Sequence, residues 1–62
     1  MYEIIKEFTA AGKNNFWHWF DNNVGVGLEW DEVDKGAWTC VAMDELTGSD
    51  VKNIKAYIRG MK

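Results

Sequence analysis

Cysteine is almost absent from this chain, and the single residue, Cys40, excludes a disulfide within the chain. One cysteine and one histidine, His18, also supply at most two of the four ligands that a structural zinc ion usually takes. A chain of 62 residues buries only about 60% of the surface that its unfolded form exposes. We therefore expect its stability to come from dense aromatic packing or from self-association, with no metal and no cofactor.

Long hydrophobic runs are also missing. The longest apolar stretches, near residues 16–20 and 37–43, are far shorter than the roughly 20 residues that a membrane-spanning helix needs. The chain opens with Met1-Tyr2-Glu3 and has no apolar segment typical of a signal peptide. Because a lone free cysteine also suits a reducing compartment, the sequence predicts a cytoplasmic protein without a membrane partner, folded as a single compact domain over residues 1–62.

Basic residues are fewer than acidic ones, and the two signs are separated along the chain. The formal net charge is −3. Residues 29–45 carry six acids and one lysine, a net charge of −5, whereas residues 46–62 carry four basic residues and one acid, a net charge of +3. The sequence therefore predicts an electrically polar molecule, with an acidic middle and a basic carboxy-terminal segment.

Aromatic side chains are what the sequence has in excess, nine in all with four tryptophans. Residues 16–20 read Phe-Trp-His-Trp-Phe, between Asn14-Asn15 and Asp21-Asn22-Asn23. Aromatic residues fit a pleated surface, and asparagine-rich ends are typical of turns, so this pattern predicts a strand at residues 16–20. One or two turns of buried helix are the alternative. In the strand the five side chains alternate between two faces: Phe16, His18 and Phe20 on one, Trp17 and Trp19 on the other.

The first segment, residues 2–8, fits two periods. As a strand it places Tyr2, Ile4 and Phe8 on one face, with Glu3, Ile5 and Glu7 on the other. As a helix over residues 2–11 it forms an apolar stripe that Gly12 would end. We favour the strand, because the aromatic segment that follows needs a partner.

A hairpin and a helix complete the expected fold. Residues 24–31 alternate apolar with small or acidic side chains, Asp34-Lys35-Gly36 is turn-like, and residues 37–43 return as a strand. Thr47 or Ser49 can then cap a helix whose apolar stripe is Val51, Ile54, Ile58 and Met61, with Tyr57 beside it and with Lys52, Lys55, Arg59 and Lys62 opposite. The sequence predicts an α+β fold, a small antiparallel sheet of three or four strands with one C-terminal helix packed on a face. An additional N-terminal helix at residues 2–11 is the alternative.

No arrangement of residues predicts a catalytic or metal site. Residues 21–32 partly match a calcium-binding loop, but Gly25 offers no side-chain oxygen and Val26 stands where the sharp turn needs glycine. His18 and Cys40 are better explained as packed residues than as a nucleophile and its base. We therefore expect no enzymatic activity.

The acidic hairpin is the strongest functional signal. Carboxylates spaced along it, with a tryptophan among them, predict docking on a basic region of a larger protein, with a nucleic-acid-handling enzyme as the favoured partner. Such docking would inhibit or modulate that partner, as small acidic accessory proteins of phages and mobile elements often do. The expected partner-binding residues are Glu29, Trp30, Asp31, Glu32, Asp34, Asp44 and Glu45.

Two other functions stay open. Lys13, Trp17 and Trp19 could form an aromatic sheet face on which single-stranded nucleic acid stacks. The surplus of large rings could instead be buried in a homo-oligomer, which would make the chain a self-assembling structural protein.

Overall fold

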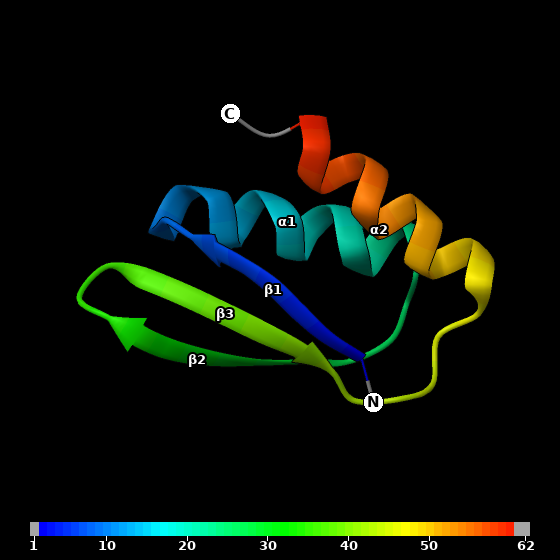
Figure 1. Ribbon diagram of the computed structural model, residues 1–62, viewed down its shortest axis with the longest axis horizontal. Coiled ribbons are helices and arrows are strands. Elements are labelled where there is room, and N and C mark those ends of the chain that lie inside the picture. The colour runs from blue at the N-terminus through cyan, green and yellow to red at the C-terminus, as the bar shows by residue number, and fades with distance from the viewer. Residues whose placement is uncertain (1, 61–62) are drawn as a thin grey trace.

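The structure is a computed structural model that describes residues 2–60. The chain forms its elements in the order strand, helix, strand, strand, helix (Figure 1). The α+β fold with a small antiparallel sheet is confirmed, and the sheet has three strands. The elements are β1 (Tyr2–Phe8), α1 (Ala10–Asn23), β2 (Leu28–Asp34), β3 (Ala37–Ala42) and α2 (Gly48–Gly60).

The order of strands in the sheet is β1-β3-β2, with β3 antiparallel to both neighbours. β1 and β2 therefore run parallel to each other, and α1 connects them across the strand that lies between, as in a split β-α-β unit. Both of these strands lie at an edge of the sheet. In one row of the sheet Val41 of β3 pairs with Glu3 of β1 on one side and with Glu29 of β2 on the other.

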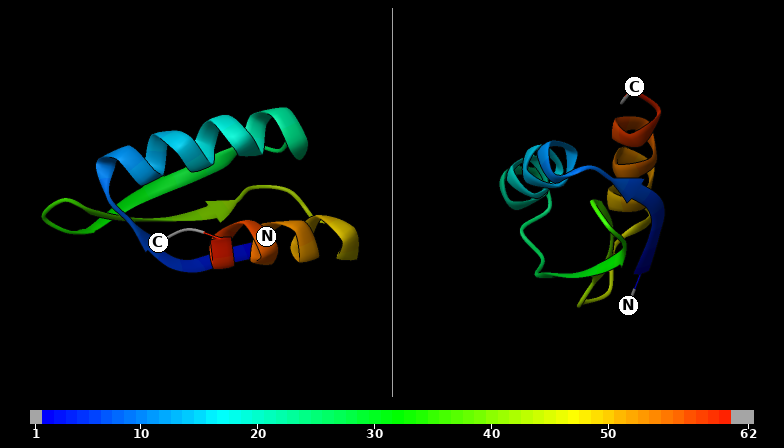
Figure 2. Two further views of the ribbon diagram at one scale, coloured as in Figure 1. Left: turned by 90° about the horizontal axis from the view of Figure 1, so that it is seen from above. Right: turned by 90° about the vertical axis from the view of Figure 1, so that its left-hand side faces the viewer.

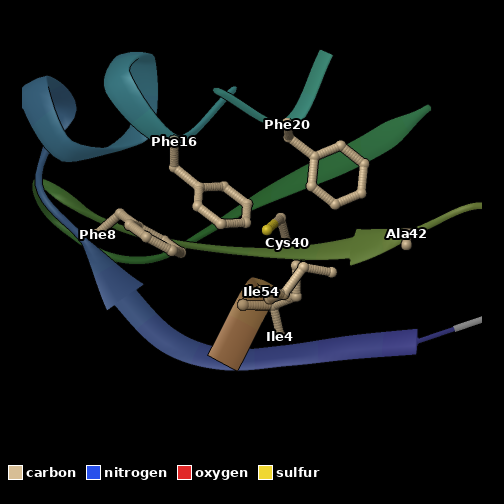
Figure 3. Packing of buried hydrophobic residues seen from close by; sticks show 7 residues of the cluster. All are labelled: Ile4, Phe8, Phe16, Phe20, Cys40, Ala42 and Ile54. Atoms are coloured by element: carbon tan, nitrogen blue, oxygen red, sulfur yellow. The ribbon is translucent and has the colours of Figure 1, made fainter. Parts of the chain in front are cut away.

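Both helices lie over the same face of the sheet, as Figures 1 and 2 show. Figure 3 shows Phe16 and Phe20 of α1 pointing toward the strands, where they meet side chains of β1 and β3 and Ile54 of α2. The seven residues of this core are at most 2% exposed. The buried core is Ile4, Phe8, Phe16, Phe20, Cys40, Ala42 and Ile54.

The strand predicted at residues 16–20 is wrong, because this segment lies inside α1. Phe16 and Phe20, four residues apart, share one side of the helix and are both fully buried. Thr9 caps the helix, since its Oγ1 accepts from the N–H of Gly12 at 3.1 Å. The asparagines near its end do not form the predicted turn: Asn22 and Asn23 each donate back to a carbonyl one helical turn earlier, at 2.9 and 2.8 Å.

The first segment is the strand that we favoured, and the alternative helix at residues 2–11 is wrong. Ile4 and Phe8 are buried, whereas Glu3, Ile5 and Glu7 are exposed. Gly12, expected as a helix stop, lies inside the first turns of α1. The alternation of apolar and charged residues on β1 therefore predicted the structure correctly, and the helical spacing over residues 2–11 did not.

The hairpin is confirmed, although its first strand begins at Leu28 and not at residue 24. Residues 24–27 are needed to end α1 and to turn the chain back toward the sheet. The N–H groups of Val24 and Gly25 both donate to the carbonyl of Phe20, at 2.8 and 3.0 Å. Gly25 has a φ of 76°, a conformation that side chains disfavour, so this glycine ends the helix.

The C-terminal helix is confirmed as α2, and Thr47 is its cap. The Oγ1 of Thr47 accepts from the N–H of Asp50 at 3.1 Å. Ile54 is fully buried, and Val51, Tyr57 and Ile58 are half-buried. Met61 and Lys62, predicted on the apolar stripe and on its basic side, lie outside the described residues.

Candidate functional site

The face of the sheet that points away from the helices has no covering element among residues 2–60 (Figure 2). Strand alternation assigns its side chains, because the residues between them on β1, β2 and β3 pack toward the helices. We call this surface the outer face. Its residues are Glu3, Ile5 and Glu7 on β1, Thr39 and Val41 on β3, and Glu29 and Asp31 on β2.

Four exposed carboxylates gather on the outer face. Glu3 and Glu29 lie on either side of Val41, so their backbones are about 10 Å apart, two strand spacings. Asp31 lies on the same face as Glu29, about 7 Å further along β2. Since no lysine or arginine is among the outer-face residues, the like charges repel one another, and a cationic partner would relieve this repulsion.

Apolar side chains lie among these carboxylates. Ile5 is 89% exposed. Val41 is half-buried between its two acidic neighbours. Carboxylates placed beside apolar groups can hold a partner by charge and by burial together.

The predicted hairpin carboxylates are all exposed, but they do not form one cluster. Glu29 and Asp31 lie on the outer face. Glu32 pairs with Trp38, on the side of β2 that faces the helices, and Asp34 lies next to the hairpin turn. The remaining two predicted residues, Asp44 and Glu45, lie in the connection between β3 and α2.

Trp30, predicted as a docking anchor, faces the helices. Its ring meets the rings of Phe8 and Phe16 edge to face, with centroids 5.6 and 6.2 Å away. The residue is half-buried, and its Nε1 is buried without a hydrogen-bond partner in the part of the chain that the structure describes. Trp30 therefore packs beside the core and does not present its ring to a partner on the outer face.

The predicted aromatic sheet face is also wrong, because Trp17 and Trp19 lie on α1. Two residues apart on a helix, they point about 200° away from each other. Trp19 stacks on Tyr57 of α2 with a centroid distance of 4.5 Å and an interplanar angle of 22°. Trp17 is 40% exposed and lies 6.0 Å from Trp30. These two tryptophans do not form one stacking surface.

Lys13 is half-buried among three tryptophan rings. Its Nζ lies 3.9 Å from the ring centroid of Trp38, 5.6 Å from that of Trp30 and 5.8 Å from that of Trp17. A cation at such distances is attracted to the faces of the rings. Lys13 therefore links α1 to the hairpin, and its charge already interacts with these tryptophan rings.

Cys40 and His18 are in different surroundings. Cys40 is 1% exposed, and burial raises the pKa of its thiol to about 12, so the thiol is neutral near pH 7. His18 lies on the exposed side of α1. No group of three or more potential metal-ligating side chains occurs among residues 2–60.

Three residues of the outer face that matter for its chemistry, Glu3, Ile5 and Glu7, were missed as site residues from the sequence. Their signal was the alternation in residues 2–8, which placed them on the side of β1 away from the core. The sequence did not indicate that β1 and β2 would present their acids on one surface. That depends on the insertion of β3 between them.

A scan against protein-family models, a search of curated proteins and a search of solved structures each found no match to this chain. Within the described part of the chain, neither helix has the length and apolar character needed to cross a membrane.

Proposed function

We propose that this protein is a non-enzymatic interaction module whose outer face docks on a basic region of a larger, nucleic-acid-handling protein. The observation that carries the proposal is the gathering of Glu3, Glu7, Glu29 and Asp31 on a sheet face that no described element covers. Docking there would exclude nucleic acid from the same basic region and so inhibit or modulate the partner.

The electrostatics of the outer face support binding to a positive surface. Complementary charge speeds the encounter of two proteins and suppresses wrong partners, and it weakens as salt is added. Nucleic acid is recognised largely through its negative backbone, so a rigid array of carboxylates can compete for the same lysines and arginines. The carboxylates stand on two strands that β3 joins, which fixes the spacing of Glu3 and Glu29.

The exposed apolar groups support a contact that is more than electrostatic. Ile5 is almost completely exposed next to Glu3 and Glu7, and burying such a side chain is worth about 1.5–3 kcal/mol. Interfaces generally place apolar groups at the centre and charges at the rim. Val41 therefore supplies an apolar centre between Glu3 and Glu29, and Ile5 supplies an apolar contact at the β1 edge, where it also lines a groove with Lys55 and Arg59 of α2.

Capture from a lysate tests the proposal. The tagged protein, with and without nuclease treatment, should retain one protein band that survives nuclease and fades as salt is raised. A band that disappears with nuclease would point to nucleic-acid binding instead. If no band appears, self-assembly becomes the better explanation.

Matched variants locate the contact. The double substitution Glu29→Gln and Asp31→Asn removes two charges from the outer face while keeping side-chain size. The control, Glu32→Gln with Asp34→Asn, removes the same charge from the same strand near the turn. We expect the first pair to weaken capture by about tenfold or more, and the second by much less. Equal losses would place the contact on the hairpin as a whole, and no loss with either would contradict the proposal.

A further inference from the structure

We infer that the free edge of β2 accepts an added strand, an extended segment of the basic partner with lysine or arginine at alternate positions. This inference rests on the proposed function and names how the partner would bind. Main-chain hydrogen bonds along a sheet edge supply affinity in such complexes, and alternate side chains supply specificity.

The two edges of the sheet are not equivalent. β2 pairs with β3 without interruption from Leu28 to Glu32 and shifts register only after that, between Glu32 and Asp34, so its backbone is regular over the first five residues. β1 has a register shift between Ile4 and Phe8, which disrupts the regular ladder. Bulges of this kind protect an edge from pairing with another chain. Among the described residues no segment pairs with the outer edge of either strand, and only β2 has the regular geometry that an added strand needs.

The charges on β2 select the occupant. An added strand would place its outward side chains about 5 Å from Glu29 and Asp31, where lysine or arginine is favourable. Its inward side chains would lie beside Leu28 and Trp30, both half-buried, and these positions favour threonine or valine. A second copy of β2 would instead bring its own carboxylates against the same two residues, which disfavours pairing between copies.

Backbone methylation distinguishes strand addition from docking on the outer face. The probe is a fluorescent nine-residue peptide in which lysine alternates with threonine and valine, titrated into the full chain at low salt. Two further peptides carry backbone N-methyl groups at alternate residues. In one of them these groups lie along one edge of the extended peptide, and in the other they lie along the opposite edge. We expect one methylated peptide to bind about tenfold or more weakly, because its backbone donors toward β2 are lost, while the other binds within about twofold of the parent. Equal affinities of the two methylated peptides, or no binding of the parent, would overturn the inference.

Hydrogen exchange adds a positional readout. With the parent peptide bound, amide protons of β2 that exchange freely should become protected, and those of Ile5 to Glu7 on β1 should not. Protection confined to β1 would also overturn strand addition.

The same peptides separate failure of this inference from failure of the proposed function. If the Glu29→Gln, Asp31→Asn variant loses affinity for all three peptides, yet the methylated pair bind alike, strand addition is wrong and an acidic docking surface remains. If this variant binds the parent peptide as tightly as the unmodified protein does, the outer-face carboxylates have no role and both proposals are contradicted.

Discussion

Among single residues, Lys13 has the most unusual surroundings, because three tryptophan rings lie within 6 Å of its Nζ. Lys13→Met keeps most of the aliphatic stem and removes the charge. We expect the free energy of unfolding to fall by about 1 kcal/mol, the usual value of an exposed or partly desolvated cation–π contact. Urea denaturation measures this fall. The control is Lys52→Met on the exposed side of α2, which should change stability by less than about 0.5 kcal/mol. If the two variants behave alike, the ring contacts contribute nothing.

Cys40 gives a pH-dependent prediction. Its folded pKa is raised to about 12, whereas the unfolded thiol titrates near 9, so the folded state keeps the proton longer. The corresponding stability is fully present below pH 9 and is lost as the pH rises from about 9 toward 12, by at most about 1.4 kcal/mol per pH unit. Unfolding should be compared with that of Cys40→Ala, since lysines and tyrosines titrate in both proteins. Identical slopes above pH 9 in the two proteins would contradict the assignment.

At the scale of elements, the cap of α2 is a direct test of the helix boundary. The sequence allowed Thr47 or Ser49, and the hydrogen bond from the N–H of Asp50 to Thr47 selects the first. We expect Thr47→Ala to lower the free energy of unfolding by about 1 kcal/mol and Ser49→Ala to leave it nearly unchanged. Thermal or urea unfolding distinguishes them. A larger effect of Ser49→Ala would mean that the helix begins two residues later.

The elements also show why sequence patterns succeeded for the hairpin and α2 and failed for α1. Alternation on β2 and β3 and the spacing of Val51, Ile54 and Ile58 are periodic signals, and both were confirmed. In residues 16–20 every position is aromatic or histidine, so neither a period of two nor one of 3.6 stands out. Tertiary packing favours the helix over the strand for these residues, because the helix buries Phe16 and Phe20 together. Residue-level β preference was overridden by this tertiary contact.

For the molecule as a whole, the charge separation read from the sequence becomes a separation between surfaces. The outer face carries acids. At the edge of the sheet opposite β2, a groove of about 330 Å³ is lined by basic residues of β1 and α2 and by Ile5 of the outer face; the basic residues are Lys6, Lys55 and Arg59. The hairpin acids were predictable because they are close in sequence. The contribution of Glu3 and Glu7 was not, because it requires β1 and β2 to flank β3.

The outer face should be a functional surface and not a stabilising one. Removing the charges of Glu29 and Asp31 together relieves repulsion, so we expect the free energy of unfolding of this double variant at low salt to stay the same or to rise by up to about 0.5 kcal/mol. Ile5→Thr should likewise change stability little, since Ile5 is almost fully exposed. Both variants should nevertheless bind the captured partner more weakly than the unmodified protein does. A marked loss of stability in either would show that these side chains serve the fold.

Chemical-shift mapping shows whether the outer face is the binding surface. The isotope-labelled full chain would be titrated at low salt with the lysine-alternating peptide. We expect the backbone signals of Glu29, Asp31 and Val41 to shift with peptide concentration and to return when salt is added, because this peptide binds beside β2. Shifts centred on the exposed side of α1, around Trp17 and His18, would contradict it.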